Sequence, residues 1–531
     1  MRREEGRQAV EHLRRSALAV TGMVATPHEL ATAAGLAALR EGGAAVAANA
    51  VLTVVYPDQT AIGGDCLLMY FDGSSGRLHG LNGSGRAPAT ASRAALREAG
   101  YTRMPVRGIH AVTVPGTIAA WDQAAIRFGR LGLSRLLAPA IGYARDGFPV
   151  SAGLARRLAG VREMVAGNEA LRGNYTVNGG LPRAGQRLRL PELAASLEQI
   201  AREGRDAFYR GTIAERIVAT SEGLDGMLTL DDLSSHQGEW VEPLTTDYRG
   251  VTVAEMPPNS QGLTALIELN LAEQVEPPAK WGTAAHLHPL IEAKKRAFAA
   301  RDAELSDPEF GAVDTGRLTS KTFAHDLWRD YDPMRALAGT PSLAGDTVYL
   351  CAVDRDGNAA SLIQSLYMSF GSGVVADGTG IVLQNRGAYF SLDDDHPNRL
   401  EGGKRTLHTL MPALLLKDGQ LLGPIGTQGG DAQAQVHLQL VTNLVDYGLE
   451  PQAAIDAPRW VAGGTGPMDV TLEGRFPKET FAGLATRGHA VRRADDWDAS
   501  FGHAQMILRD SERGVWRGAA DARADGLALG Y

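Results

Sequence analysis

Apolar residues recur along the chain at two spacings, which together predict a mixture of helices and strands. Helical patterns cover residues 27–41, 44–55, 117–172, 192–220, 263–271, 287–305 and 433–445. Short β-rich runs, several joined by Asp-Gly turns, cover residues 17–25, 67–71, 77–81, 248–253, 347–353, 360–365, 380–383, 412–417 and 420–426. Helices that flank many strands are typical of a layered α+β or α/β domain.

The first helix has sequence signals at both ends. Thr26 is expected to be its cap and Pro27 its first helical residue, and Glu29 stands three positions after the cap. The pair Gly42-Gly43 is a stop signal. The sequence therefore predicts one strand followed by one capped helix at the start of the fold.

Residues 306–346 contain few apolar runs and are expected to form an exposed, loop-rich passage that ends at Asp346. The plainest interpretation of the next stretch, 347–353, is an ordinary hairpin strand closed by an Asp-Gly turn. A second interpretation is that the chain is cut before Thr347, whose hydroxyl then becomes a nucleophile activated by its own new α-amine. The two are compatible, because a nucleophile can begin a strand.

Composition narrows the class of protein. A chain of 531 residues is too long for one simple core, so two or more lobes or one large layered domain are expected. The net charge of −8 is modest and the basic residues are scattered, which argues against binding of nucleic acid or a membrane surface. Cys66 and Cys351 lie in apolar runs and are expected to be buried thiols. Without a good secretory signal or a run of about 20 apolar residues, we expect a cytoplasmic protein.

Several familiar catalytic signatures are missing from the sequence, namely G-x-S-x-G, G-x-x-x-x-G-K-[ST] and H-E-x-x-H. His286 and His288 stand two apart at a predicted helix start, where their side chains should point to different faces. The glycine-rich run 426–431 opens a predicted helix, where backbone N–H groups can hold an oxyanion. A plain strand-to-helix turn explains that run equally well.

A series of short motifs, in order along most of the chain, resembles the γ-glutamyltransferase (γ-glutamyl transpeptidase) family of N-terminal-nucleophile (Ntn) hydrolases. Each motif is weak alone, and their order and spacing carry the resemblance. The matching stretches are residues 30–46 leading into Pro57 and 62–64, then 114–117, 144–148, 256–258, 307–310, 353–359, 370–373, 402–405, 429–430 and 456–459.

The resemblance implies a precursor that cleaves itself between Asp346 and Thr347, which gives a large subunit, 1–346, and a small subunit, 347–531. It implies a four-layer αββα sandwich formed jointly by both subunits, with a helical periphery on the large one. It makes Thr347 the nucleophile, Gly429 and Gly430 the oxyanion-hole pair, and Ser365 a hydroxyl that supports the nucleophile. No metal or organic cofactor is required, and a dimer of heterodimers is possible.

The chain departs from the family where a γ-glutamyl group would bind. The family's arginine before Ala-Pro falls at Ser84, and an arginine stands two residues later, at Arg86. The carboxylate that grips the α-amine falls at Tyr389, and the neighbouring glutamine falls at Arg386. A buried ammonium without its carboxylate is costly, so this site should not favour a glutamyl zwitterion.

Further departures lie around the same pocket. The family's paired serines fall at His408 and Thr409, and its asparagine falls at Tyr367. Val348-Tyr349 replaces a hydroxyl residue and a histidine. Residues 391–403 form a short connection where many transferases carry a longer lid, so the site should be more open.

Three functions follow as alternatives. The first is an autoprocessing amidohydrolase or acylase for a small acyl donor whose carboxylate pairs with Arg386, with Arg86 as a second candidate. The second is a true γ-glutamyltransferase or glutathione hydrolase that uses these arginines in altered roles. The third is a non-cleaving binding or scaffold homologue, which Val348-Tyr349 beside the cut site keeps open. Arg386 as an ordinary solvated arginine is the plain alternative to its substrate role.

Overall fold

Two seven-stranded sheets form the centre of the computed structural model, which describes residues 14–43, 45–340, 345–464 and 466–531. Every strand in both sheets is antiparallel to its neighbours. The first sheet runs in the order β1 (Ala17–Ala19), β20 (Val515–Ala520), β19 (Ala504–Asp510), β15 (Gln420–Thr427), β14 (Ala413–Lys417), β9 (Val251–Glu255) and β8 (Leu244–Tyr248). The second runs in the order β21 (Leu527–Gly530), β2 (Met23–Thr26), β10 (Asp346–Val353), β11 (Ala359–Tyr367), β3 (Asp65–Asp72), β4 (Arg77–Asn82) and β7 (Glu239–Val241).

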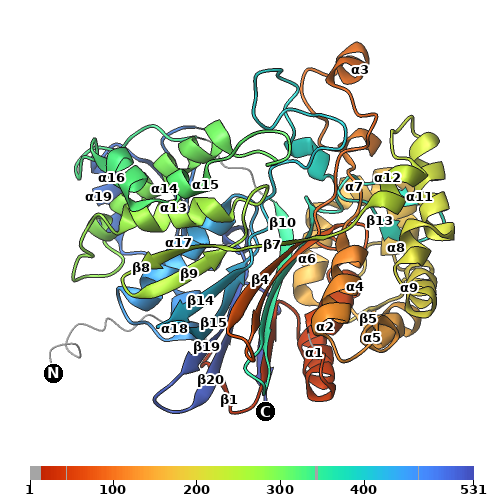
Figure 1. Ribbon diagram of the computed structural model, residues 1–531, viewed down its shortest axis with the longest axis horizontal. Coiled ribbons are helices and arrows are strands. Elements are labelled where there is room, and N and C mark those ends of the chain that lie inside the picture. The colour runs from red at the N-terminus through yellow and green to blue at the C-terminus, as the bar shows by residue number, and fades with distance from the viewer. Residues whose placement is uncertain (1–13, 44, 341–344, 465) are drawn as a thin grey trace.

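The two sheets pack face to face, and helices cover both outer faces (Figure 1). Apolar side chains from both sheets, such as Tyr349 and Ile507, share one buried core between them. The second sheet is covered by α1 (Glu29–Glu41), α2 (Ala45–Val55), α4 (Thr117–Phe128), α5 (Leu133–Asp146) and α9 (Pro191–Glu203). The first is covered by α13 (Gly262–Ala272), α14 (Ala284–Glu304) and α17 (Ala432–Val445). This is the αββα sandwich that the resemblance implies, so the expected fold class is confirmed.

Strand β10 lies in the middle of its sheet, where its side chains alternate between two environments. Val348 and Leu350 belong to the core under the helices, whereas Tyr349 and Cys351 belong to the core between the sheets. This period of two follows from the pleat of a strand. Thr347 stands two residues before Tyr349, next to a break in the pairing register between Asp346 and Val348.

The start of the chain differs from the prediction. Residues 17–25 form two short strands, β1 and β2, which belong to different sheets and pair with β20 and β10. The chain crosses between the sheets at residues 20–22. The cap of α1 is His28, whose ring nitrogen accepts from the backbone N–H of Leu30, rather than Thr26. The predicted stop is confirmed, because Gly42 ends the helix with φ of 100°.

Two other segments also differ. Residues 248–253 contain the turn at Arg249-Gly250 between β8 and β9, so the predicted single strand is the junction of a hairpin. The loop-rich passage 306–346 includes two short helices, α15 (Thr315–Leu318) and α16 (Lys321–Trp328). Residues 341–344 of that passage, and the start of the helix predicted from residue 44, lie outside the described residues.

Among the described residues, no helix is both long enough and apolar enough for a membrane span.

The remaining elements form the periphery and the connections. These elements are α3 (Arg93–Glu98), α6 (Ala152–Gly160), α7 (Arg162–Gly167), α8 (Glu169–Tyr175), α10 (Asp206–Tyr209), α11 (Thr212–Glu222), α12 (Leu230–Ser235), α18 (Pro451–Asp456), α19 (Lys478–Thr486), the 3-10 turns η1 (Ile109–Ala111), η2 (Arg386–Tyr389) and η3 (Ala499–Phe501), and the strands β5 (Phe148–Pro149), β6 (Arg187–Leu188), β12 (Val375–Ala376), β13 (Ile381–Val382), β16 (Trp460–Ala462), β17 (Asp469–Glu473) and β18 (Ala490–Ala494).

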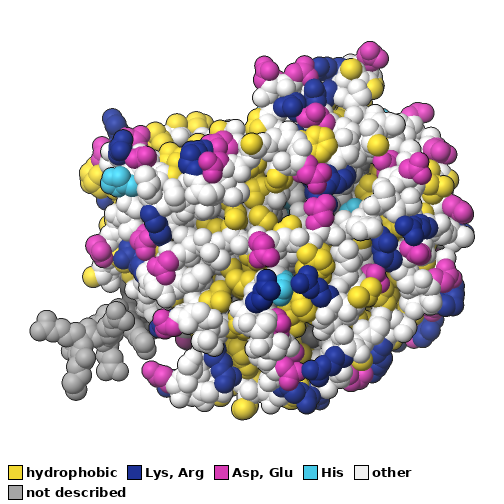
Figure 2. All heavy atoms as spheres, in the orientation of Figure 1, with side chains coloured by type: hydrophobic (Ala, Val, Ile, Leu, Met, Phe, Trp, Pro, Cys, Tyr) yellow, Lys and Arg dark blue, Asp and Glu magenta, His cyan; other side chains and the backbone are white. Residues whose placement is uncertain are grey.

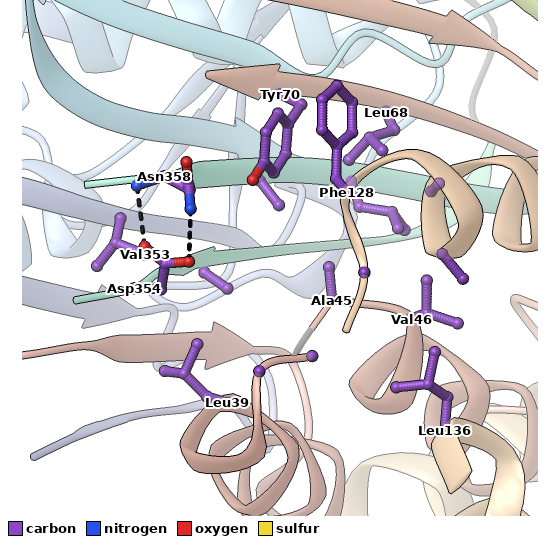
Figure 3. A pocket seen from close by; sticks show the side chains of 18 residues that line it. Leu39, Ala45, Val46, Leu68, Tyr70, Phe128, Leu136, Val353, Asp354 and Asn358 are labelled. Carbon is purple, nitrogen blue, oxygen red and sulfur yellow. Dashed lines mark hydrogen bonds between the residues drawn. The ribbon is translucent and has the colours of Figure 1, made fainter. Parts of the chain in front are cut away.

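Basic and acidic side chains are interspersed over the face seen in Figure 2. A small apolar cavity of about 110 Å³ lies at the far end of β10 from Thr347 (Figure 3). Its wall includes Leu39, Val46 and Phe128, and the carboxylate of Asp354 beside it is held by Asn358 at 2.8 and 2.9 Å. The nucleophile predicted from the sequence is therefore at the opposite end of the strand from this cavity.

Candidate active site

The hydroxyl of Thr347 lies in a compact hydrogen-bond network at the start of β10. Thr347 is buried, and its Oγ1 donates to Ser365 Oγ on the neighbouring strand β11 at 3.3 Å. Ser365 Oγ also accepts from the backbone N–H of Tyr367 at 2.6 Å and donates to the carbonyl oxygen of Asp346 at 2.5 Å. A hydroxyl has one proton and two lone pairs, so Ser365 is fully used. It therefore contacts both the predicted nucleophile and the carbonyl of the predicted scissile bond.

The glycine pair lies next to this bond. Gly429 and Gly430 follow β15 and precede α17, and both have positive φ, 133° and 58°. Gly345, two residues before Thr347, lies so close that a Cβ added to it would stand 3.1 Å from the Cα of Gly430. The backbone of the glycine pair is therefore within van der Waals reach of the segment that leads into Thr347. Side chains here would be strained at Gly429 and Gly430 and crowded at Gly345.

Arg386, the first residue of η2, is a buried cation with unused donors. Its Nη1 donates to Thr409 Oγ1 at 3.0 Å, and its guanidinium lies over the ring of Tyr367, 4.5 Å from the ring centre. Its Nε and Nη2 are buried and have no hydrogen-bond partner among the described residues. Burial lowers the pKa of Arg386 from its ordinary value, and the more distant Asp65 works in the opposite direction. A guanidinium remains charged under these conditions, and no carboxylate of the described residues pairs with this one.

Tyr389 forms part of a buried ionic group beside the glycine pair. Its hydroxyl donates to Asp431 Oδ1 at 2.5 Å, and Arg301 Nη1 donates to the same oxygen at 2.8 Å. Burial, and next the charge of Asp431, raise the pKa of the Tyr389 hydroxyl well above its ordinary value. Tyr389 is thus a neutral donor, and one carboxylate oxygen of Asp431, Oδ1, accepts from both Tyr389 and Arg301.

His408 is a neutral side chain in the wall of the site. Its Nδ1 accepts from the backbone N–H of Leu410, so Nε2 carries the proton and donates to Asp65 Oδ2 at 3.0 Å. Burial, and next the charge of Arg386, lower the pKa of His408 to about 4. The imidazole is therefore uncharged at neutral pH, and Asp65 holds it in one orientation.

Ser84 and Arg86 take part in contacts within the protein. Ser84 is buried, and its Oγ donates to Asn82 Oδ1 at 2.7 Å. Arg86 forms ion pairs with Glu239 at 3.0 Å and Glu309 at 2.7 Å, and it also contacts Asp307 and the carbonyl of Gly403. Three carboxylates surround this guanidinium, which contrasts with the unpaired nitrogens of Arg386.

The surroundings of the Asp346 carboxyl group disfavour its charged form. Burial, and next the charge of Asp58, raise the pKa of Asp346 to about 6. Arg157, a backbone hydrogen bond from Ser369, and Arg107 act in the opposite direction. The residue before the predicted scissile bond therefore carries a carboxyl that titrates close to neutral pH.

The two histidines at the start of α14 are separate, as the sequence predicts. His286 Nδ1 accepts from the backbone of Gly282, while His288 Nδ1 is 2.8 Å from His489 Nε2. Among the described residues, His288, Glu292 and His489 form the one cluster with metal-ligand spacing. The ammonium of Lys295 lies within it, 3.0 Å from Glu292 and 3.3 Å from His489. Because the Lys295 ammonium would repel a bound metal ion, the cluster is better suited to the ion pair between Lys295 and Glu292.

Four residues of the site, Gln261, Arg301, Asp431 and Asp65, were not predicted from the sequence. Asp431 stands in the glycine-rich run 426–431, Gln261 follows the matching stretch 256–258 by three residues, and each immediately precedes a helix in the structure. Arg301 lies in the last turn of α14 and Asp65 begins β3. The position of Asp431 directly after the glycine pair was the one available signal. No local pattern in the sequence joins Arg301 to it.

Comparison with known proteins shows which family this chain is related to. The family model described as gamma-glutamyltranspeptidase matches residues 31–531. The chain belongs to the γ-glutamyltranspeptidase family. It is 42% identical over 527 residues to the glutathione hydrolase-like YwrD proenzyme of Bacillus subtilis, covering 98% of this chain and 100% of that one. It is 39% identical to the oxamate amidohydrolase proenzyme of Klebsiella pneumoniae, covering 96% and 98% of the two chains.

The fold agrees with this family membership. The cephalosporin acylase from Bacillus halodurans superposes with a TM-score of 0.93 at 39% identity, covering 100% of this chain and 99% of that one. The chain is therefore an enzyme of the γ-glutamyltranspeptidase family, a family whose members include hydrolases, amidohydrolases and acylases. Its relatives named as proenzymes agree with the expectation of a precursor.

Proposed function

We propose that this member of the γ-glutamyltranspeptidase family hydrolyses the amide bond of a small acyl donor that carries a carboxylate and lacks a neighbouring amine. The observation that carries the proposal is Arg386, a buried guanidinium whose Nε and Nη2 have no partner in the part of the chain that the structure describes. A carboxylate can accept from two such donors at once, which repays the cost of keeping the cation buried. Thr409 and the ring of Tyr367 fix the guanidinium in place.

The catalytic sequence begins with self-cleavage between Asp346 and Thr347. Thr347 Oγ1 attacks the carbonyl carbon of Asp346, its proton passes to the Thr347 nitrogen, and the bond between the Asp346 carbon and that nitrogen breaks to leave an ester and an amine. Ser365 supports this step, because it donates to the Asp346 carbonyl oxygen and orients the Thr347 hydroxyl. Water then hydrolyses the ester, which leaves subunits 1–346 and 347–531 and a free α-amine on Thr347.

The mature site uses the same atoms on a substrate. The α-amine accepts the proton of Thr347 Oγ1 while the oxygen attacks the amide carbon, and the backbone N–H groups of Gly429 and Gly430 stabilise the oxyanion. The proton passes to the leaving amine as the C–N bond breaks. Water, deprotonated by the same α-amine, then releases the acyl group as an acid and restores the threonine. No residue in this scheme requires a metal or an organic cofactor.

The contacts of Tyr389 and Asp431 weigh against a γ-glutamyl donor. An α-ammonium in this pocket needs a carboxylate, and that of Asp431 already accepts from Tyr389 and Arg301. Arg86, the other candidate for a substrate carboxylate, is paired with Glu239 and Glu309. The fit between Thr347, Ser365 and the Asp346 carbonyl weighs against the non-cleaving scaffold. A cytoplasmic location and a dimer of heterodimers remain predictions.

Steady-state kinetics on matched donors tests the proposal. Oxalyl- and glutaryl-type anilides should be hydrolysed with a kcat/KM at least about 10-fold above that of γ-glutamyl-anilide, because a lost charge pair costs more than about 1.4 kcal/mol. Arg386→Met should raise KM for the acid donors and leave that for their methyl esters unchanged. Arg355→Met, in the exposed turn after β10, is the matched control. Faster turnover of γ-glutamyl-anilide by the wild type would overturn the choice of donor.

A further inference from the structure

Gln261, the residue before α13, is a buried amide with every polar atom of its side chain engaged. Its Nε2 donates to the carbonyl oxygens of Gly430 and Thr409, both at 3.1 Å. Its Oε1 accepts from Arg301 Nη1 at 2.9 Å. The partners fix the orientation of the amide, because two carbonyls can accept only from the nitrogen and a guanidinium can donate only to the oxygen.

The two carbonyls belong to the two halves of the proposed site. Gly430 is one of the oxyanion glycines, and its carbonyl oxygen accepts also from the backbone of Gln433 at 3.2 Å. Thr409 supplies the hydroxyl that accepts from Arg386. A single side chain therefore holds the peptide after Gly430 and the residue that anchors the guanidinium.

The backbone of Gln261 is held on the same side of the site. Its N–H donates to the carbonyl of His408 at 2.8 Å, and Ser260 is paired with His408 in a short parallel bridge. Arg301, which donates to the Gln261 amide, uses the same nitrogen to donate to Asp431 at 2.8 Å. Gln261 thus lies between two rigid supports, the strand-like segment through His408 and the ion pair of Arg301 with Asp431.

We propose that Gln261 is a positioning residue that couples the oxyanion hole to the carboxylate clamp, an inference that rests on the proposed function. By holding Gly430 and Thr409 at one separation, it sets the distance between the N–H groups that meet the oxyanion and the guanidinium that meets the donor's carboxylate. This distance selects the length of the acyl chain, because both ends of a short acid must be bound at once. Misplacement of either end lowers the rate even when the nucleophile is intact.

Two variants of Gln261 test this role, with Gln452→Met as the matched control. Gln261→Met keeps the volume and removes all three hydrogen bonds, while Gln261→Glu keeps the contact with Arg301 and turns an oxygen toward the two carbonyls. Gln452 is also a buried glutamine that bridges two segments, through Asp456 and the carbonyl of Ala520, outside the site. Each protein is checked for folding by circular dichroism and for self-cleavage on a denaturing gel.

The expected result is a change in two separable quantities. Both Gln261 variants should lower kcat about 10- to 100-fold for an oxalyl- or glutaryl-anilide and for its methyl ester, since Gly430 serves both. They should raise KM for the acid alone, and they should reduce the difference in kcat/KM between the oxalyl and glutaryl donors. Gln452→Met should change neither quantity. Kinetics of both Gln261 variants that match those of Gln452→Met would overturn the proposal.

The outcome separates this inference from the proposed function. If the wild type hydrolyses γ-glutamyl-anilide and leaves the acid donors untouched, the proposed donor is wrong, and kcat on γ-glutamyl-anilide still decides whether Gln261 positions the oxyanion glycine. If Gln261→Met fails to fold, Gln261→Glu carries the test, because it preserves volume and the Arg301 contact. An unchanged kcat in that variant counts against the proposal.

Discussion

At the scale of single residues, the site combines groups that the sequence identified with groups that only the fold brings together. Thr347, Ser365, Gly429 and Gly430 were found through a family resemblance, and no periodicity would have singled them out. Nε and Nη2 of Arg386 are buried and have no partner among the described residues. The polar residues next to Arg386 in the sequence did not indicate that its side chain is buried. Arg86 was the second candidate in the sequence, and its pairing was not visible there because its carboxylate partners come from segments more than 150 residues away along the chain.

The hydroxyl of Ser365 should control self-cleavage. Ser365→Ala removes the hydrogen bond to the Asp346 carbonyl and the acceptor for the Thr347 hydroxyl, so we expect the half-time of precursor cleavage to lengthen about 10-fold or more. A time course on a denaturing gel measures it. Ser361→Ala, on the same strand and bonded to the Tyr349 hydroxyl, is the control and should cleave at the wild-type rate. Equal half-times for both variants would contradict this role.

The carboxyl of Asp346 should make the precursor less stable as the pH rises. Its pKa is raised to about 6 in the fold by burial and Asp58, from an ordinary value of 3.8. The carboxylate is therefore disfavoured in the folded state, and stability is lost between about pH 4 and pH 6. In the uncleaved Thr347→Ala background, Asp346→Asn should restore about 3 kcal/mol at pH 7 and much less at pH 4, because the pKa is raised from 3.8 to about 6.

Thermal unfolding of the Thr347→Ala precursor, with and without Asp346→Asn, at pH 4 and pH 7 measures this effect. An Asn side chain keeps an oxygen that can accept from the backbone of Ser369, so the comparison isolates the charge. Asp495→Asn, at an exposed position, should leave the melting temperature unchanged at both pH values. A stabilisation by Asp346→Asn that is equal at pH 4 and pH 7 would rule out the titration as its cause.

At the scale of elements, hydrophobic pattern predicted the long helices and the central hairpins, and it failed where the chain changes sheets. Residues 17–25 were interpreted as one strand although Thr21 and Gly22 interrupt the apolar run, and the crossing between β1 and β2 lies at that interruption. Strand β8 was missed because it is half polar, with Thr245 and Asp247 exposed. Close backbone packing between loops was equally invisible, because it depends on residues that are distant in the sequence.

Glycines permit one such loop contact beside the site. Gly85 follows Ser84, and a Cβ on it would lie 1.6 Å from the carbonyl oxygen of Val114. Gly85→Ala should therefore destabilise the protein by about 2 kcal/mol or more in a denaturant titration. Gly132→Ala is the control, because a Cβ there meets no neighbour and its φ of −73° is ordinary. A Gly85→Ala protein as stable as this control would show that the loops separate easily.

At the scale of the whole molecule, cleavage before Thr347 would leave two interleaved chains. In the second sheet, β10 and β11 of the small subunit lie between β2 and β3 of the large one. In the first sheet, four small-subunit strands lie between β1 on one side and β9 on the other. Separation of the subunits would break both sheets, so the cut chain should stay together until it unfolds. This interleaving follows from strand order, which the sequence pattern did not contain.

The identity of the new N-terminus tests the central claim most directly. Intact-mass spectrometry of the purified protein under denaturing, non-reducing conditions should give two species with the masses of 1–346 and 347–531. Native mass spectrometry of the same sample should give their sum or a multiple of it, and Thr347→Ala should give one uncut chain in both. A single species of 531 residues from the wild type, or a cut at any other bond, would contradict Thr347 as the nucleophile.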